Sequence, residues 1–324
     1  MRTALITGVH GQDGSYLAQQ LQSAGWRVVG AVRDPTRAAR ALAAWGIEGV
    51  ELVACDLQQQ DSVSAVLASV RPQQVYNLAA LSSGAAMFDD PLTLTDVNGL
   101  AVARWLEAIR CVDPSVRFCQ ASSSEMFGHT TVSPQAEDAP MRPRTPYGAA
   151  KQYGHAMVQI YRQRHGLFAC SAILFNHESP RRGPDFVTRK ISRHAALIKL
   201  GLANHVCLGN LDARRDWGFA GDHMRALALL LDRPAPLDCV VATGQTHSVR
   251  DFCAAAFAHV GLDWRDHVRT EPQDFRAPET VQLVGDAGLA RQALGWAPQV
   301  DFDALVAMMV DADLARLRSP SADV

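Results

Sequence analysis

The sequence lacks the features that would place it in a special class of protein. Its first residues, MRTALITG, lead into a strand-like segment and show none of the architecture of a signal peptide. No run of 18 or more apolar residues occurs, which argues against a membrane span. The formal net charge is only −2 over 324 residues, so no global field favours nucleic acid or acidic membranes. We therefore expect a cytoplasmic globular protein.

Cysteine and histidine are present, but without the spacing that metal sites need. The seven cysteines are scattered and form no CxxC pair, a pattern typical of reduced, mostly buried thiols in a cytoplasm. The segment NHES at 176–179 has no second histidine at the spacing of a zinc motif. We therefore expect no metal site.

What the sequence does contain is a regular alternation of two kinds of segment. Runs rich in β-branched residues, such as TALITG, RVVGAV and ACSAILF, alternate with amphipathic helical stretches. This order predicts an α/β protein with a doubly wound parallel sheet of the Rossmann type. We expect residues 1–175 to form this domain, with a returning segment at about 212–250. Residues 176–211 and 251–324 should form a smaller mixed domain.

A glycine-rich turn follows the first predicted strand. The segment GVHGQDG places Gly8, Gly11 and Gly14 between a strand and a helix. There, close backbone approach and a helix N-terminus suit a pyrophosphate. Tight packing alone would also explain glycines in such a turn. The position in a strand–turn–helix unit at the start of the chain favours a dinucleotide-binding domain.

Residues at the ends of the next strands bear on which dinucleotide binds. An arginine after the second strand suits the 2′-phosphate of NADP, whereas a carboxylate suits the ribose hydroxyls of NAD. This chain has both, Arg33 and then Asp34. Asp56 ends the third strand, where it could accept a hydrogen bond from the adenine amino group. We expect NADP because Arg33 is present, and NAD stays open as an alternative because of Asp34.

A second motif combines a tyrosine and a lysine with a serine-rich turn. In PYGAAK, Tyr147 and Lys151 are four residues apart and share one helix face. A lysine ammonium one turn away favours the phenolate, so that Tyr147 can take a proton from a sugar hydroxyl. An isolated match of this kind would more often be helical surface. The segment ASSSE at 121–125 adds hydroxyls at a strand end, and the combination is typical of a dehydrogenase.

These segments resemble the extended short-chain dehydrogenase/reductase family and, within it, the GDP-mannose 4,6-dehydratases. The resembling stretches cover nearly the whole chain, and they include ALITGVHGQDGSYLA, ASSSEMFG, TPYGAAKQYGH, ILFNHESPRRGPDFVTRKISR and LGNLDARRDWGFAGDH. The resemblance implies an NADP-dependent lyase of deoxysugar biosynthesis. It also implies that residues 176–211 and 251–324 bind the nucleotide sugar.

The resemblance assigns roles position by position. The catalytic residues would be Ser123, Glu125, Tyr147 and Lys151. Besides Tyr147 and Lys151, the cofactor would contact Gly8, His10, Gly11, Gln12, Asp13, Gly14, Arg33, Asp56, Leu57, Leu78, Ala79, Ala80, Ser82, His177 and Arg182. The GDP-hexose would contact Ser82, Ser123, Glu125, Asn176, Lys190, Arg215, Arg276 and Glu279. Arginine pairs well with a diphosphate, although any one of these arginines could instead be a surface charge. Arg181 and Arg214 we expect to be structural.

The resemblance also implies a reaction, in which Glu125 has the distinguishing role. Hydride would leave C4 of GDP-mannose while Tyr147 takes the hydroxyl proton. Glu125 would remove the C5 proton and protonate the departing C6 hydroxyl, and return of the hydride to C6 would give GDP-4-keto-6-deoxymannose. Epimerases of this fold need no carboxylate at that position. The alternatives are a dehydratase, 4-epimerase or 4-reductase for another nucleotide sugar, such as GDP-heptose, and a non-catalytic dinucleotide-binding protein.

Two further expectations concern the second strand and the assembly. The family carries Arg-Arg-Ser-Ser after the second strand, whereas this chain reads Arg33-Asp34-Pro35-Thr36. The helices near 98–110 and 146–164 have apolar stripes, and in this family such helices pair two subunits. We expect a homodimer, and a homotetramer only if the altered loop still reaches a neighbouring subunit.

Overall fold

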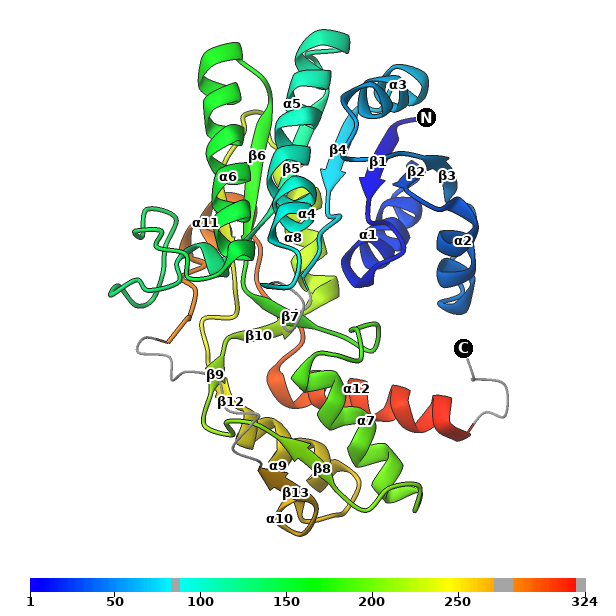
Figure 1. Ribbon diagram of the computed structural model, residues 1–324, viewed down its shortest axis with the longest axis vertical. Coiled ribbons are helices and arrows are strands. Elements are labelled where there is room, and N and C mark those ends of the chain that lie inside the picture. Colours follow the sequence, from blue (N-terminus) through cyan, green and yellow to red (C-terminus); the bar gives the residue numbers. More distant parts are fainter. Residues whose placement is uncertain (83–87, 271–281, 319–324) are drawn as a thin grey trace.

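A seven-stranded parallel sheet forms the larger part of the molecule (Figure 1). The computed structural model describes residues 1–82, 88–270 and 282–318. The strands of this sheet are β1 (Thr3–Thr7), β2 (Arg27–Val32), β3 (Glu51–Ala54), β4 (Gln74–Asn77), β5 (Arg117–Ser123), β6 (Ala169–Leu174) and β11 (Cys239–Val241). Their order is β11-β6-β5-β4-β1-β2-β3, and every neighbouring pair is parallel. The doubly wound fold is therefore confirmed. Its strand order reverses between β1 and β4, where such sheets bind ligands.

Helices cover both faces of this sheet, each through its own apolar cluster. One face carries α1 (Gln12–Ser23), α2 (Pro35–Ala44), α8 (Ala220–Asp232) and α11 (Gly288–Leu294). The other carries α3 (Gln60–Val70), α5 (Ala101–Val112) and α6 (Pro146–His165). The short α4 (Pro91–Thr95) and the π-helical turn η2 (Asp96–Leu100) lead into α5. Within the described ranges, no helix is long and apolar enough to cross a membrane.

Local sequence signals set the two ends of α6, the helix that carries Tyr147 and Lys151. The Thr145 hydroxyl accepts a hydrogen bond from the Gly148 N–H at 3.0 Å, and Pro146 occupies the first helical position. At the other end, Gly166 takes a left-handed conformation with φ 68°. These signals place Tyr147 in the first turn of α6, near the carboxyl ends of the sheet strands.

A second group of elements lies beyond the carboxyl ends of the sheet strands (Figure 1). Its helices pack around an apolar cluster of their own, which includes Ile191, Trp217, Phe252 and Met309. The elements are β7 (Asn176–Glu178), α7 (Val187–Lys199), β8 (Val206–Leu208), β9 (Arg214–Arg215), β10 (Trp217–Phe219), β12 (His247–Ser248), α9 (Val249–His259), α10 (Trp264–His267), β13 (Val268–Thr270) and α12 (Phe302–Arg318).

One stretch departs from the expected domain division. We expected residues 251–324 to belong wholly to the smaller domain, yet α11 packs on the sheet. Ala290 and Trp296 are fully buried in the cluster on that face. The Trp296 indole also donates a hydrogen bond to the Asp222 carbonyl at 2.8 Å. The sequence of a short apolar helix does not indicate which of two apolar cores the helix packs against. That choice depends on the tertiary structure.

Candidate active site

The turn between β1 and α1 depends on the absence of side chains. Gly8 has φ 67°, and a Cβ there would lie 2.9 Å from the backbone of Ala79. A Cβ on Gly14 would lie 2.3 Å from the Gly8 carbonyl oxygen. Among the described residues, no side chain caps the α1 N-terminus at Gly11. A helix N-terminus left uncapped in this way can offer its N–H groups and the positive end of its dipole to an anion.

A chain of buried amides and hydroxyls holds the neighbouring strand ends in register. The Thr7 hydroxyl accepts hydrogen bonds from the N–H groups of Leu78 and Ala79, both at 3.0 Å. It donates to the Asn77 side-chain oxygen at 2.8 Å, and the Asn77 amide donates to Gln120 at 2.7 Å. These contacts fix the backbone at 78–79 against the glycine turn.

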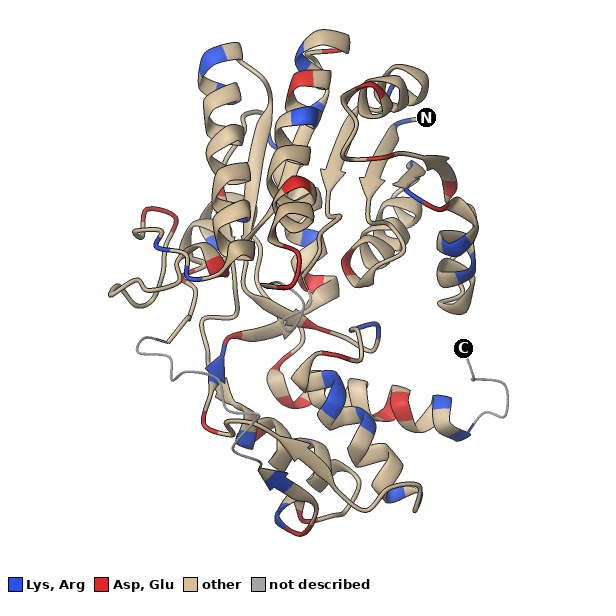
Figure 2. Cartoon of the chain, in the orientation of Figure 1, with Lys and Arg blue, Asp and Glu red and all other residues tan. Residues whose placement is uncertain are grey.

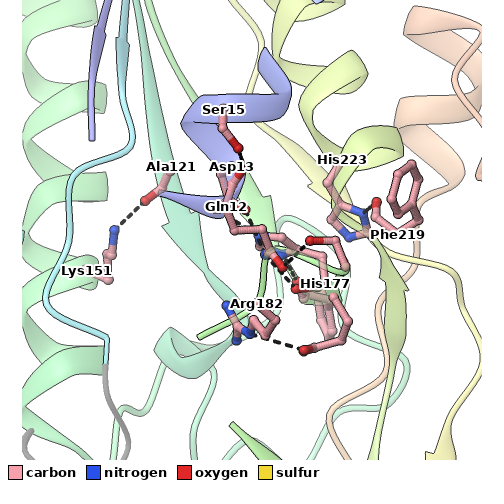
Figure 3. A network of polar contacts seen from close by, with 12 residues as sticks. Gln12, Asp13, Ser15, Ala121, Lys151, His177, Arg182, Phe219 and His223 are labelled. Atoms are coloured by element: carbon pink, nitrogen blue, oxygen red, sulfur yellow. Dashed lines mark hydrogen bonds and ion pairs between the residues drawn. The ribbon is translucent and has the colours of Figure 1, made fainter. Parts of the chain in front are cut away.

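A charged pair, formed by the half-buried Asp13 and the buried His177, connects α1 to β7. The Asp13 carboxylate lies 3.0 Å from Nε2 of His177, whose Nδ1 faces the Phe175 carbonyl at 2.7 Å (Figure 3). Burial alone would raise the pKa of Asp13, but the charge and hydrogen bond of His177 hold that pKa well below its ordinary value. Burial alone would lower the pKa of His177, but Asp13 raises it. Both imidazole nitrogens face acceptors, which fits a protonated His177.

His223 of α8 covers the other face of this pair. Its ring stacks on His177 with centroids 4.8 Å apart, and its Nδ1 lies 3.1 Å from the Phe219 carbonyl (Figure 3). Burial and the neighbouring His177 charge lower the pKa of His223 to about 3. Two stacked imidazoles therefore carry only one positive charge, and that charge lies on the ring that faces Asp13.

The predicted catalytic triplet comes together at the end of β5. The Ser123 hydroxyl lies near the Tyr147 phenol, and Lys151 Nζ lies 5.6 Å from the centre of the Tyr147 ring. Burial raises the pKa of Tyr147 to about 12, while the Ser123 hydroxyl and the Arg182 charge act in the opposite direction. Lys151 donates to the Ala121 carbonyl at 2.8 Å, and burial lowers its pKa to about 8.

Glu125 lies beside this triplet, in the short 3₁₀ turn η3 (Ser124–Met126). Its backbone N–H donates to the Ser123 hydroxyl at 3.2 Å, and its charge contributes to raising the pKa of Tyr147. A Cβ on Gly148, the residue after Tyr147, would lie 2.5 Å from the Glu125 carbonyl oxygen. The missing side chain at Gly148 therefore lets η3 rest directly on the first turn of α6.

The residues that follow β2 and β3, named here the outer end of the site, are more exposed than the residues around Tyr147. Arg33 is exposed, and the Asp34 carboxylate caps α2 by accepting from the Arg37 N–H at 3.0 Å. Asp56 accepts from the Gln58 N–H at 3.0 Å and remains half-buried. The ring nitrogen Nδ1 of His10 is buried without a protein partner in the described residues.

The residues predicted to bind the nucleotide sugar are only partly gathered. Asn176 lies on β7 next to His177, and Lys190 is exposed on α7. Arg215 lies on β9, where it pairs with β12. Arg182 forms an ion pair with the buried Glu178 at 3.1 Å. Three other predicted residues are half-buried after the carboxyl ends of β3 and β4, namely Leu57, Ala80 and Ser82. Arg276 and Glu279 lie outside the described residues.

The two arginines expected to be structural are held by protein groups. Arg214 donates to the Thr246 carbonyl at 2.6 Å and lies 3.6 Å from Asp251. Arg181 donates to the Ser15 hydroxyl at 3.0 Å and to Gln19 at 2.7 Å. These contacts are in keeping with a structural role for both side chains.

Comparison with known proteins decides the family. Residues 5–309 match the family model described as GDP-mannose 4,6 dehydratase. GDP-mannose 4,6 dehydratase 1 of Arabidopsis thaliana is 44% identical over 332 residues, which cover 97% of this chain and 90% of that protein. The chain belongs to the GDP-mannose 4,6-dehydratase family.

Solved structures share the fold of this family member. UDP-glucose 4-epimerase of Thermus thermophilus, in complex with NAD, is 25% identical with a TM-score of 0.83, over 96% of this chain and 98% of that one. RMD of Pseudomonas aeruginosa, complexed with NADPH, is 22% identical with a TM-score of 0.82, over 98% of this chain and 100% of that one. Both neighbours carry a nicotinamide dinucleotide.

The residues present fit such a cofactor. A Cβ on Gly8 or Gly14 would meet neighbouring backbone. Within the described residues, no side chain caps the α1 N-terminus, and Nδ1 of His10 has no protein partner. By contrast, no group of three or more His, Cys, Asp or Glu side chains in the described ranges is arranged to hold a metal ion.

Several residues of this family member's site carry no signal that sequence reasoning could use. The Asn98 side chain, in η2, bonds both the N–H and the carbonyl of Leu81 at 2.9 Å. His223 meets His177 only through the tertiary fold. Gly148 looks like an ordinary helical glycine until η3 is seen against it.

Proposed function

We propose that this chain catalyses the dehydration of GDP-mannose to GDP-4-keto-6-deoxymannose, as a hydro-lyase with NADP as its cofactor. The observation that carries the proposal is the carboxylate of Glu125, on the turn directly after Ser123, whose charge contributes to raising the pKa of Tyr147, in a chain of this family. Oxidation and reduction at C4 need only the serine, the tyrosine and a cofactor. Elimination of water needs a further group that can take and return a proton.

Tyr147 and Ser123 handle the proton of the sugar 4-hydroxyl. When bound, the nicotinamide supplies the acceptor for the C4 hydrogen and later the donor to C6. Tyr147 takes the 4-hydroxyl proton while the Ser123 hydroxyl orients the same oxygen. Because burial opposes the phenolate, the nearby cations Lys151 and Arg182 matter for its formation.

Glu125 handles the protons at C5 and C6. The C4 ketone makes the C5–H bond acidic, and Glu125 takes that proton. The C6–O bond then breaks as Glu125 returns the proton to the departing hydroxyl, so that one water leaves. Return of the hydride to C6 would leave an enolate, which would take a proton from solvent at C5. The oxidation at C4 and the reduction at C6 balance, and the overall reaction has no net redox change.

The outer end of the site favours NADP. Arg33 and Arg37 are both exposed at the start of α2, where a 2′-phosphate would find two guanidinium groups. Asp34, which would repel a phosphate, points its carboxylate at the α2 N-terminus and accepts the Arg37 N–H. The helix dipole partly compensates its charge. Arg37 thus replaces the second arginine that the family places directly after Arg33.

The nucleotide end of the substrate lies with the second group of elements. Lys190 on α7 and Arg215 on β9 are cations that suit the diphosphate of a GDP-sugar, and Asn176 lies on β7 between these elements and the cofactor turn. Arg276 and Glu279 stay proposed contacts, on the resemblance alone. The division into a cofactor domain and a sugar-nucleotide domain stays part of the same proposal.

A homodimer would cover the apolar outer face of α6 and η2. Tyr153 and Ile160, seven residues apart on α6, are 41% and 51% exposed, and Leu100 of η2 is 41% exposed. Large apolar side chains gathered in this way on the surface indicate an interface. A tetramer would need further contacts at the loop after β2.

Incubation with GDP-mannose and a catalytic amount of NADP in heavy water tests the proposal. We expect a product that has lost one water and has gained deuterium, detected by mass spectrometry. A sugar nucleotide that has lost no water but has an inverted stereocentre would indicate an epimerase. Bound cofactor without turnover of any sugar nucleotide would indicate a non-catalytic protein.

A further inference from the structure

The loop that follows β7 connects the cofactor turn to the far end of the chain. Ser179 is fully buried, and its hydroxyl donates to the Gln12 side chain at 2.8 Å. Gln12 in turn donates to the His177 carbonyl at 3.1 Å. The loop therefore rests on the first turn of α1, directly between His177 and Arg182.

Arg181 fastens the same loop to the outer side of α1. Its guanidinium donates to the Ser15 hydroxyl at 3.0 Å and to Gln19 at 2.7 Å. It also lies over the Tyr16 ring, 4.0 Å from the centroid, and faces the Trp45 ring at 5.6 Å. Arginine stacked on aromatic rings in this way holds a fixed orientation.

Arg316, in the last turns of α12, approaches the loop from the other side. Its guanidinium donates to the Pro180 carbonyl at 2.8 Å and lies 4.7 Å from the centre of the Trp45 ring. Trp45 directly follows the last residue of α2. Its indole ring lies near two guanidinium groups, one from Arg181 in the loop and one from Arg316 in α12. In Figure 1 the C-terminal end of α12 accordingly lies below α2.

Asp313 anchors Arg316 to α7. This carboxylate is only 2% exposed and accepts from the Ser192 hydroxyl at 2.8 Å and from Arg189, both on α7. Arg316 lies 3.6 Å from the same carboxylate. In Figure 2 the acidic turn of α12 lies between basic turns of α7 and the basic end of α12. Asp313 thus links the end of α12 to both α7 and the arginine that holds the loop.

We propose that Arg181 and Arg316 are positioning residues for the dinucleotide, and that the end of α12 forms part of the cofactor site. Together with Trp45 and Asp313 they form a clamp, named here the α12 clamp, that holds residues 179–182 against α1. The inference rests on the proposed function in one respect, that His177 and Arg182 face the bound cofactor. A loop held in its binding conformation costs the ligand less ordering entropy.

The α12 clamp predicts a change in cofactor affinity without a change in chemistry. If Arg316→Ala leaves the loop in its binding conformation only a tenth of the time, the apparent Kd for NADPH rises about tenfold. Arg316→Lys keeps the charge but loses the planar group over Trp45, and should show a smaller rise. The kcat at saturating cofactor and GDP-mannose should stay within about twofold of the wild type.

Titration of NADPH by fluorescence, without any sugar nucleotide, measures this effect directly. Hydrogen exchange at the amides of Ser179, Arg182 and Gly183 should accelerate in Arg316→Ala and in Arg181→Ala. Arg318→Ala removes an exposed arginine of the same helix and should change neither quantity. Leu314→Ala weakens the packing of α12 in its own cluster and should lower Tm while leaving the Kd unchanged.

Three outcomes would overturn the inference. The first is a Kd for Arg316→Ala within twofold of the wild type, and the second is an equal rise in Leu314→Ala, which would indicate general destabilisation. The third is a lowered kcat with an unchanged Kd. A wild-type protein that binds neither NADPH nor NADH would instead refute the proposed cofactor, so the two failures are distinguishable.

Discussion

The two ends of the proposed dinucleotide site are built in opposite ways. At the catalytic end, Tyr147, Lys151 and Asp13 have partners that come from distant elements, and their pKa values are shifted by burial and by neighbouring charges. At the outer end, Arg33 and Asp34 are exposed, and the Asp34 carboxylate accepts a local hydrogen bond from the Arg37 N–H at the start of α2. Changes at the buried end should therefore act on chemistry and stability together. Changes at the exposed end should alter cofactor choice alone.

Removing the acid at the catalytic end should have the largest effect. Glu125→Gln cannot take the C5 proton, so dehydration should fall by about 10³-fold or more. Oxidation at C4 should continue and appear as a burst of NADPH absorbance. Because the Glu125 charge contributes to raising the pKa of Tyr147, the pH dependence of this burst should move to lower pH. Asp138→Asn, an exposed carboxylate-to-amide change, should alter neither. Normal dehydration by Glu125→Gln would refute its role.

Moving that acid without removing it should have the next largest effect. In Gly148→Ala the new Cβ would meet the Glu125 carbonyl, so η3 must shift away from α6. A displacement of this kind can cost about 10²-fold in rate. Gly154→Ala is the matched control, because the contact nearest to its Cβ would be the side chain of Val102 rather than backbone. Steady-state assays with GDP-mannose should separate the two variants, and equal rates would show that the contact is unimportant.

The charged pair Asp13–His177 should make the free energy of unfolding depend on pH. Asp13 has a lowered pKa, so its contribution is present above its ordinary value of 3.8 and is lost as the pH falls through the lowered one. His177 has a raised pKa, so its contribution is present below 6.5 and is lost as the pH rises through the raised one. Asp13→Asn should therefore cost most between about pH 3.8 and 6.5, by about 1–3 kcal/mol.

Urea unfolding at several pH values measures this difference, and NMR titration of the His177 ring should show a lowered pKa in the variant. Asp61→Asn, on the exposed first turn of α3, serves as the control. A pH-independent difference between Asp13→Asn and the wild type would mean that the pair is not charged in the folded protein.

The smallest effect is expected at the exposed end. Arg37→Ala should reduce the preference for NADP over NAD by about tenfold, because one charge-assisted contact to the 2′-phosphate is lost. Dehydration with saturating NADP should stay near that of the wild type. Arg40→Ala removes an equally exposed arginine further along α2 and should leave the preference unchanged. The ratio of the Kd values for NADPH and NADH measures this preference. Equal ratios in both variants would show that Arg37 does not contact the 2′-phosphate.

The same contrast explains how much of this site the sequence could reveal. Gly8, Gly14, Tyr147 and Lys151 belong to motifs within one turn or helix, and local spacing is enough to find them. The role of Glu125 follows from the family resemblance and not from a local motif. The partner of Asp13 is not predictable from the sequence, since His177 meets Asp13 only when β7 lies beside α1.

The outer end shows the opposite limit of sequence reasoning. In the sequence, the pair Arg33 and Asp34 is an ambiguous cofactor signal, because the sequence does not show which of the two side chains faces the ligand. The structure gives Asp34 a separate task as the cap of α2. A local hydrogen bond of this kind depends on where the helix begins, which the sequence indicates only to within a few residues.

The buried amides between β1 and β5 have a further consequence. The N–H groups of Leu78 and Ala79 point to Thr7, Thr7 to Asn77, Asn77 to Gln120, and Gln120 to the Ala121 carbonyl, which also accepts from Lys151. The first of these bonds runs from the end of β4 to β1, and the following ones run from β1 through β4 to β5. Turning either amide over would set acceptor against acceptor, so the chain of bonds has a single direction. The backbone of the cofactor turn and the catalytic lysine are thus oriented by one shared polarity, although 73 residues of sequence separate Leu78 from Lys151.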